Sequence, residues 1–208
     1  MALSGLGAAP SFAGDACVAG YYEAHATEIA AALRLGPDGT YDFQLVYGAL
    51  DEESHGVWKA GADAVLLTSE AYKPPDISLE DVSASADGGY RFELELSEHF
   101  SRQYFDVRLE WDDGSVTFEQ MQEDGLGLEP GTRPVAARLV LPIFDLASDR
   151  VELPDKPARL KFQFSPNDIG KASFTDYPLA IDGGDLVMQR HGRELRFERR
   201  SAECDVQP

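Results

Sequence analysis

Residues 29–47 read IAAALRLGPDGTYDFQLVY, and this stretch decides the fold. Apolar residues alternate with other residues on both sides of a central turn: Ile29, Ala31, Leu33, Leu35, then Tyr41, Phe43, Leu45 and Tyr47. A period of two places each set on one face of a β-strand. Between them, Asp38-Gly39 supplies the positive φ angles that two-residue hairpin turns require. The stretch therefore predicts an antiparallel hairpin.

The same signals recur along the chain on either side of this hairpin. Asp-Gly pairs occur again at residues 87–88, 113–114 and 182–183, and period-two runs occur at residues 90–96 and 160–164. The Ala-rich residues 23–33 are the one stretch where a helix competes, because Ala favours helices. The alternation that continues to Leu35 favours a strand there instead. We predict an all-β antiparallel protein in which each of the four Asp-Gly pairs makes a hairpin turn.

Proline and glycine divide the chain into parts. Lys73-Pro74-Pro75 is a stiff connector that pairs poorly in sheets, and residues 123–134 form a long Gly/Pro-rich segment. We predict a β-meander formed by residues 17–72 and completed by residues 173–204, with a β-sandwich segment over residues 76–172. Residues 1–16 are small and apolar and are interpreted as a disordered tail or a signal-peptide remnant.

The two cysteines, Cys17 and Cys204, lie at opposite ends of the expected folded region. If the last strands return to pair with the first, a disulfide between them closes the whole fold. The alternative is a pair of free thiols in a reducing cytoplasm. We predict the disulfide, and with it a periplasmic or secreted protein.

The charge balance excludes several kinds of partner. The formal net charge is −19, from 18 basic and 37 acidic residues. Such a chain repels nucleic-acid phosphates and anionic lipid headgroups, so neither is an expected partner. No stretch of 18 apolar residues occurs, so membrane insertion is not expected. The 10% aromatic content is that of a folded chain and not of an acidic disordered one.

The segment from residue 20 to residue 70 resembles the lipocalin-like meanders of bacterial envelope proteins, including the N-terminal barrel of copper-resistance and envelope-stress lipoproteins. The matching residues are Leu33, Leu35, Asp38, Gly39, Tyr41, Gly56, Trp58, Leu66, Leu67 and Thr68. The segment also resembles uncharacterised bacterial secreted proteins that contain YGALD. The resemblance implies an antiparallel lipocalin-like barrel. The stress lipoproteins carry Cys-x-x-Cys where this chain has residues 23–28 without cysteine, so copper handling is not implied.

The candidate site residues are the aromatic residues of this segment and an acidic cluster after them. In a barrel, the aromatic side chains either fill the interior or line a ligand cavity; they are Tyr22, Tyr41, Phe43, Tyr47 and Trp58. Asp51, Glu52 and His55 are expected at the barrel rim, as a polar site or as an idle hairpin tip. Known catalytic and nucleotide-binding motifs are missing, and we predict no catalytic residue, metal site or cofactor.

These residues lead to three hypotheses about function. The leading one is a non-enzymatic binding or interaction module that holds an apolar small molecule or engages an envelope protein. The first alternative is a structural spacer, which predicts a filled interior and an apolar patch elsewhere. The second is an acid/base enzyme using Asp51, Glu52 and His55 with Tyr47, which predicts that His55 meets a carboxylate and faces a cavity.

Overall fold

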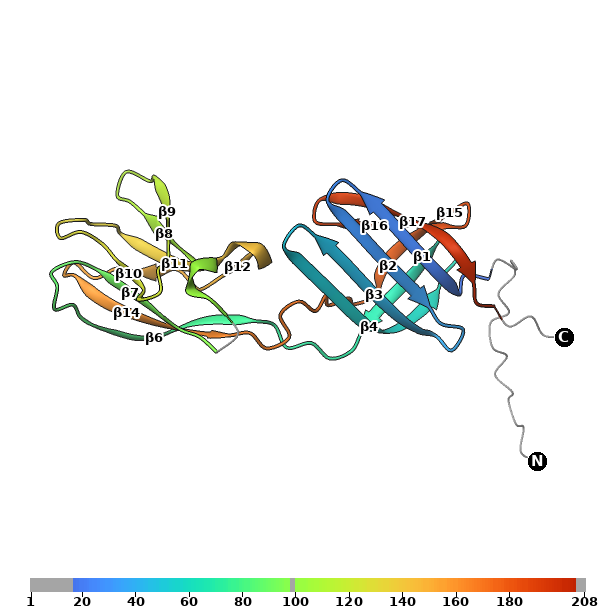
Figure 1. The fold of residues 1–208 in the computed structure, drawn as a ribbon, viewed down its shortest axis with the longest axis horizontal. Helices are drawn as coiled ribbons and strands as arrows, with labels where there is room; N and C mark the ends of the chain where they lie inside the picture. The colour runs from blue at the N-terminus through green and yellow to red at the C-terminus, as the bar shows by residue number, and fades with distance from the viewer. Residues whose placement is uncertain (1–16, 98–99, 205–208) are drawn as a thin grey trace, which may run out of the picture. The chain divides into compact units, whose positions relative to one another are not determined.

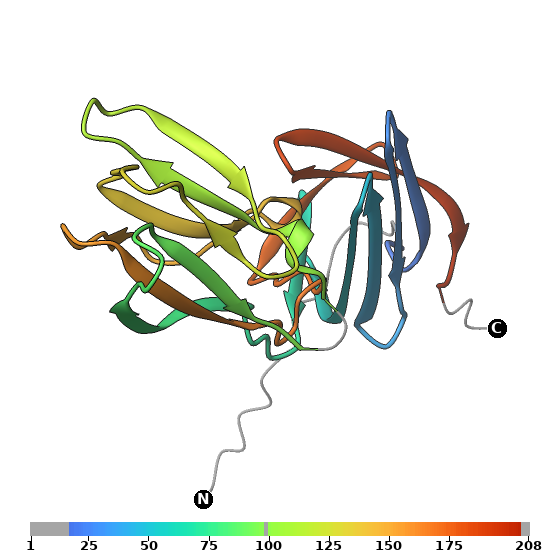
Figure 2. The same cartoon turned by 60° about the vertical axis from the view of Figure 1, so that its left-hand side comes forward.

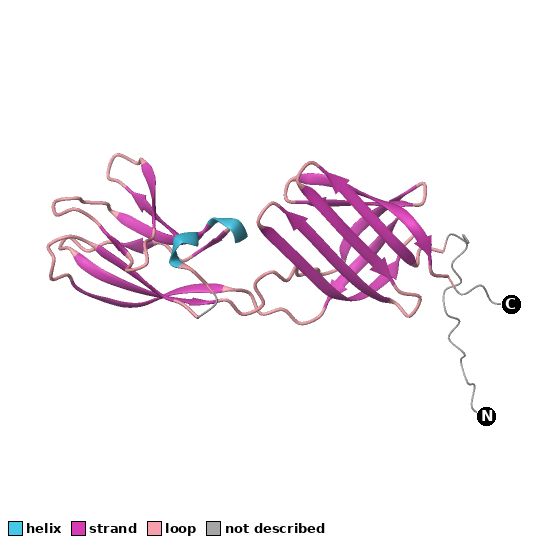
Figure 3. Cartoon of the chain, in the orientation of Figure 1, coloured by secondary structure: helices cyan, strands magenta, loops and turns pink. Residues whose placement is uncertain are grey.

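The computed structural model describes residues 17–97 and 100–204, and these form two compact units. The first unit contains the residues up to Tyr47, Glu53–Glu70 and the residues from Ala172 onward. The second contains Gly48–Glu52 and Ala71–Lys171. Both units are built almost entirely of strands (Figure 3). The predicted tail, residues 1–16, lies outside the described residues.

The first unit is a closed antiparallel barrel of eight strands in the order β1-β17-β16-β15-β5-β4-β3-β2 (Figure 1). The strands are β1 (Gly20–Ala26), β2 (Ile29–Leu35), β3 (Thr40–Tyr47), β4 (Leu50–Ala60), β5 (Ala64–Ser69), β15 (Tyr177–Asp182), β16 (Asp185–Arg190) and β17 (Arg193–Ala202). This architecture is compatible with a lipocalin-like barrel and confirms the predicted fold class.

The hairpin of residues 29–47 is present as predicted. β2 and β3 pair with Leu33 opposite Phe43, and the alternating apolar residues face the barrel core. Oδ1 of Asp38 accepts hydrogen bonds from the backbone N–H and the hydroxyl of Thr40, which fixes the turn. The Ala-rich residues 23–33 are extended, so the helix alternative is wrong. A turn at Thr27 and Glu28 divides them between β1 and β2, and Glu28 adopts a φ of 64° there.

The two ends of the described chain meet at the closing seam of the barrel. β1 pairs with β17, so that Gly20 lies opposite Ala202. Cys17 and Cys204 form a disulfide, with Cα atoms 5.9 Å apart and a sequence separation of 187 residues. The predicted bridge is therefore confirmed. The pairing of β17 with β1 brings the two cysteines together, as the prediction required.

The second unit is a sandwich of two sheets, seen as two layers in Figure 2. One sheet has the order β10-β7-β14-β6, and the other has the order β12-β11-β8-β9, with β13 also paired to β11. The bounds are β6 (Asp76–Ala84), β7 (Arg91–Glu95), β8 (Asp106–Glu110), β9 (Val116–Gln120), β10 (Leu126–Gly127), β11 (Ala136–Leu141), β12 (Leu146–Ala147), β13 (Val151–Glu152) and β14 (Ala158–Ser165). Two 3₁₀ turns, η1 (Arg102–Tyr104) and η2 (Pro142–Phe144), complete it.

One predicted hairpin turn is wrong. Asp38-Gly39, Asp113-Gly114 and Asp182-Gly183 each connect paired neighbouring strands, as expected. Asp87-Gly88 does not, because β14 lies between β6 and β7 and pairs with β7 in parallel. An Asp-Gly pair favours a local turn, but it does not determine which strand β7 pairs with. β7 pairs with β14, whose core-facing residues complete the sheet. Among the described residues, no helix has the length and apolarity needed to cross a membrane.

Candidate functional site

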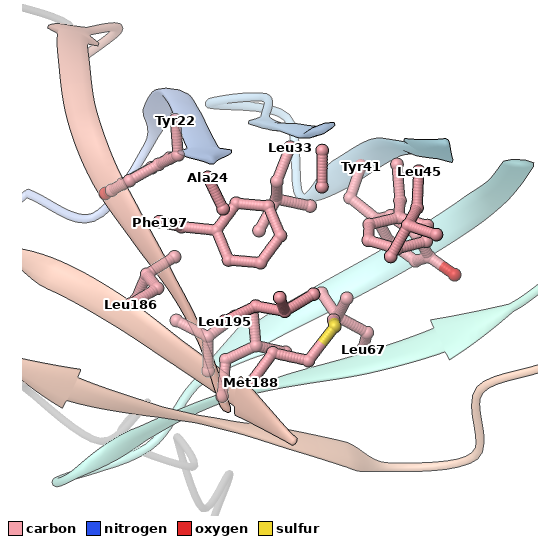
Figure 4. Close-up of a cluster of buried hydrophobic side chains, with 14 of the residues drawn as sticks. Tyr22, Ala24, Leu33, Tyr41, Leu45, Leu67, Leu186, Met188, Leu195 and Phe197 are labelled. Atoms are coloured by element: carbon pink, nitrogen blue, oxygen red, sulfur yellow. The ribbon is translucent and has the colours of Figure 1, made fainter. Parts of the chain in front are cut away.

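The barrel interior, where the sequence placed an aromatic-lined enclosure, is filled by side chains from opposite walls (Figure 4). Phe43 of β3 is fully buried, and its ring centroid lies 6.4 Å from that of Phe197 on β17. Leu33, Met188 and Leu195 pack into the same cluster. An eight-stranded barrel is just wide enough for side chains to occupy its interior. The interior is therefore a packed core.

Phe174, between β14 and β15, contributes a ring to this core from outside the barrel strands. Its ring meets Phe43 edge-on at 5.4 Å and lies 6.3 Å from Tyr41 and 5.0 Å from Tyr177. Ser69 holds the segment, because its backbone N–H donates to the carbonyl of Phe174 and its hydroxyl accepts from the N–H of Phe174. The place of Phe174 in the core could not be predicted from the sequence, because a lone aromatic residue in a loop carries no periodic signal.

The two innermost tyrosines among the predicted residues have their hydroxyls satisfied inside the barrel. Tyr22 donates to the carbonyl of Val18 at 2.6 Å, and the Tyr41 and Ser54 oxygens are 2.8 Å apart. Burial raises the pKa of both phenols, and the Arg199 guanidinium above the Tyr22 ring partly opposes this for Tyr22. Each hydroxyl already has a hydrogen-bond partner within the fold, as expected for buried core residues.

Trp58 and Tyr47 are only partly buried. The indole N–H of Trp58 donates to the carbonyl of Gly36 at 2.9 Å, which ties β4 to the β2–β3 turn. Tyr47 lies at the end of β3 under the guanidinium of Arg193, 5.4 Å from the ring centroid. A guanidinium over a ring is a favourable contact in itself. Both residues have structural contacts that do not require a ligand.

Asp51, Glu52 and His55 lie on β4, and the strand alternation separates them. Asp51 and His55 project to the outer face, whereas Glu52 projects to the other face. The carboxylate nearest His55 is that of Asp42 on β3, with Nδ1 of His55 2.7 Å from Oδ1 of Asp42. This pair is about half exposed, at 48% for His55 and 52% for Asp42. His55 therefore does contact a carboxylate, but the carboxylate belongs to Asp42 and not to Asp51 or Glu52, and the pair lies on the outer wall of the barrel.

Three of the surface hollows formed by described residues are large enough to note, and His55 lines none of these three. One, of about 440 Å³, lies over β7 and β14 and is lined by Glu93, Arg102 and Lys161 among others. A second, of about 230 Å³, lies on the outer wall of β1, β2 and β3 beside His25. The third, of about 670 Å³, runs between β6 and the segment Ala147–Glu152 of the sandwich. Over residues 17–97 and 100–204, no three His, Cys, Asp or Glu side chains gather as a metal site.

Comparisons of this chain with protein-family models, with curated proteins and with solved structures find no match. The class of protein is therefore the one that the architecture defines: a closed eight-stranded antiparallel barrel with a disulfide at its seam and a β-sandwich between β5 and β15. Its functional residues must be argued from this molecule alone.

Proposed function

We propose that this protein is a non-enzymatic interaction module of the bacterial periplasm or exterior, and that it binds a protein partner through its sandwich. The observation that carries the proposal is the exposure of apolar side chains on the strands that end the two sheets. Phe118 on β9 is 60% exposed and Val82 on β6 is 46% exposed. Exposed apolar residues at a sheet edge are a common feature of protein–protein contacts.

The filled barrel favours a protein partner over a small apolar ligand. A ligand inside the barrel would have to displace Phe43, Phe174 or their neighbours, whose burial stabilises the fold. The filled interior and the exposed apolar residues also fit the structural spacer, which is the second candidate. The two differ in whether anything binds at β6 and β9.

The compartment is inferred from the disulfide. Disulfides persist in oxidising environments and are rare in reducing ones. The resemblance of residues 20–70 to envelope meanders supports the same assignment.

The first experiment tests the barrel as a carrier. The full chain is titrated with a fluorescent fatty-acid analogue, and tryptophan emission and the probe emission are recorded. We expect no saturable binding by the wild-type chain, and binding by Phe43→Ala, in which deletion of a buried ring leaves an apolar cavity. One-to-one saturable binding by the wild-type chain refutes the proposal in favour of a lipophile carrier.

The second experiment tests for a protein partner. A photo-reactive amino acid is placed at position 82 or 118 in cells of the source organism, and cross-linked products are identified by mass spectrometry. Position 46 is the matched control, because Val46 is 48% exposed on the barrel wall. A defined cross-linked protein at 82 or 118, and not at 46, supports the proposal. Its absence at both sandwich positions favours the spacer.

A further inference from the structure

β6 is a terminal strand whose core-facing side is only partly covered. In its pairing with β14, Ile77 lies opposite Phe164, Leu79 opposite Phe162 and Val82 opposite Leu160. Residues directly opposite each other share a face of the sheet, and these three β14 residues are buried in the sandwich core. Ile77, Leu79 and Val82 therefore face inward. Their exposure nevertheless rises along the strand, from 3% through 37% to 46%.

The cover is incomplete because the opposite sheet ends in very short strands. β12 and β13 have two residues each, and they lie where a longer strand would close the sandwich over β6. The groove of about 670 Å³ runs there, between residues 76–79 of β6 and residues 147–152. The sandwich thus has an open side with apolar residues along its floor.

The backbone of β6 is also free along this side, since β6 pairs only with β14. The N–H of Ser85 donates to the carbonyl of Pro157, which places residue 85 in a hydrogen-bonded pair with β14. Such pairs occur at every second residue of an antiparallel ladder. Ser83 and Asp81 therefore bond to β14, and Val82 and Ala84 direct their N–H and C=O groups to the open edge.

The groove and the adjoining part of β6 carry negative charge. Asp76, Asp149 and Glu152 line the groove, and Glu80 and Asp81 follow on β6. The single basic residue among the lining residues, Arg150, bonds to Glu110 and Glu152. Within the described part of the chain, no cation lies within ion-pair distance of Asp76, Asp81 or Asp149. An incoming strand with Lys or Arg would supply the missing counter-charge.

We propose that β6 and this groove are an acceptor site for an extended segment of a partner protein, in which apolar residues alternate with Lys or Arg. The segment adds to β6 as an outer strand, bonding to the free N–H and C=O of Val82 and Ala84. Its apolar side chains cover Leu79 and Val82, and its basic side chains, on the opposite face of the added strand, meet Asp76 and Asp81. This strand addition is a common mode of peptide recognition. The inference rests on the proposed function and names the partner's chemistry.

A second copy of this chain is a poorer occupant. Pairing of β6 with β6 would place two strands that each carry Asp76, Glu80 and Asp81 side by side, and like charges close together across a strand pair are destabilising. The total charge of −19 adds to the repulsion between copies. We therefore assign the groove to a basic partner segment.

The test uses the full chain and three synthetic peptides with blocked ends. The peptide KVKVKVKVK has the proposed pattern, EVEVEVEVE inverts its charge, and KVKVPVKVK interrupts its strand. Affinity is measured by fluorescence anisotropy, and the site by hydrogen exchange of backbone amides. We expect the first peptide to bind most tightly and to protect the Val82 and Ala84 amides. The other two should bind at least tenfold more weakly, and added NaCl should weaken binding because the contacts are ionic.

The decisive variant is Val82→Pro. It removes an N–H that points to the open edge and leaves the bonds to β14 intact, and proline is tolerated at strand edges for this reason. We expect at least a tenfold loss of affinity for KVKVKVKVK with an unchanged circular dichroism spectrum. The matched control is Phe118→Pro on β9, which should bind the peptide like the wild-type chain. Val82→Lys, which adds a positive charge beside the groove, should also weaken binding of the peptide. This variant replaces Val82→Pro in the test if the proline variant does not fold.

Several results would overturn the inference. They are unchanged binding by Val82→Pro or Val82→Lys, equal binding of EVEVEVEVE, no binding of KVKVKVKVK, and a concentration-dependent dimer that Val82→Pro abolishes. None of these affects the cross-linking or fatty-acid experiments. A defined partner cross-linked at position 118 would keep the proposed function while this site is rejected.

Discussion

The hydroxyls of Tyr41 and Ser54 meet in the mainly apolar interior of the barrel. Ser54 is one of the few buried polar side chains among the described residues, at 3% exposure, and Tyr41 is 1% exposed. Two polar atoms in such a place are tolerated because each satisfies the other, and removal of one leaves its partner without a hydrogen bond. The energy of the interaction between the two hydroxyls can therefore be measured apart from what each side chain contributes alone.

A double-mutant cycle tests this pair. Tyr41→Phe alone should lower the free energy of unfolding by roughly 1–3 kcal/mol, because it leaves the Ser54 hydroxyl buried and unbonded. Adding Ser54→Ala to Tyr41→Phe should cost little more, since no polar atom is then left unsatisfied. Urea unfolding of the four proteins gives the coupling. Strict additivity of the two single substitutions would show that the hydroxyls do not interact.

The same phenols make the protein sensitive to alkali. Burial raises the pKa of Tyr22 and Tyr41 above the usual value near 10, so the folded state holds these protons more tightly than the unfolded state. Their contribution to stability is complete below about pH 10 and is lost as the pH rises above it. Unfolding free energies measured from pH 8 to pH 11 should fall less steeply for Tyr41→Phe than for the wild-type chain. Tyr104→Phe, which removes an exposed hydroxyl, should follow the wild-type slope.

Among the elements, β4 and β5 approach each other closely at Gly56. A Cβ built on Gly56 would lie 2.2 Å from the carbonyl oxygen of Thr68 and 2.8 Å from Cα of Ser69. Both neighbours are backbone atoms, so relief requires the strands to separate. Gly56 belongs to the Gly-x-Trp motif, and the motif is explained by this approach together with the bond from Trp58 to Gly36.

Gly56→Ala should therefore destabilise the barrel, by about 1–3 kcal/mol if the strands shift as overpacked cores do. Thermal unfolding and hydrogen exchange of the β4–β5 amides measure the effect. Gly127→Ala on β10 is the control, because only the end of the Arg91 side chain lies near its Cβ, at 4.0 Å. An unchanged midpoint for Gly56→Ala would mean that the close approach does not restrict this position.

Local patterns predicted the strands well and their partners less well. The alternation in residues 29–47 specifies both the strands and the turn, since everything it needs lies within a few residues. Asp87-Gly88 carries the same local signal, yet its flanking strands are separated by β14, which comes more than seventy positions later. The pairing of β7 with β14 depends on which apolar faces complete a core, and no window of sequence contains that information.

The sequence could predict which residues face the barrel interior, but not how their side chains are arranged there. Tyr22, Tyr41 and Phe43 could be assigned to an inward face, but whether that face encloses a cavity depends on Phe174, which enters from a loop. The acidic cluster of residues 51–55 was read as one group, whereas alternation along β4 divides it and pairing with β3 gives His55 the carboxylate of Asp42. The open side of β6 carries no sequence signal, because it arises from the shortness of strands in the other sheet.

For the whole molecule, the disulfide is the long-range constraint. The chain-entropy model assigns roughly 5 kcal/mol to a loop of 187 residues in a fully unfolded chain. If the sandwich remains folded while the barrel unfolds, the flexible part of that loop is shorter and the stabilisation is smaller, because loop entropy grows with the length of free chain. The bridge therefore acts mainly on the barrel.

Reduction should lower the unfolding midpoint of the barrel and leave that of the sandwich unchanged. The chain has two tryptophans, Trp58 in the barrel and Trp111 in the sandwich, so each unit has its own fluorescent reporter. Trp111→Phe reports on the barrel and Trp58→Phe on the sandwich, each with and without dithiothreitol. Cys17→Ser with Cys204→Ser should reproduce the reduced behaviour. Equal shifts of both reporters on reduction would contradict this assignment and indicate a single cooperative transition.

The position of the sandwich between β5 and β15 also sets the order in which the newborn protein can mature. During synthesis, the first five barrel strands leave the ribosome, then the entire sandwich, and only then the three strands that complete the ring. We expect the inserted unit to fold first, as domains do during translation. The free edge of β5 stays unpaired until β15 is made, and that of β1 until β17 is made. Cys17 has no intramolecular partner until Cys204 follows, so a holding chaperone and delayed thiol oxidation would both favour a correct product.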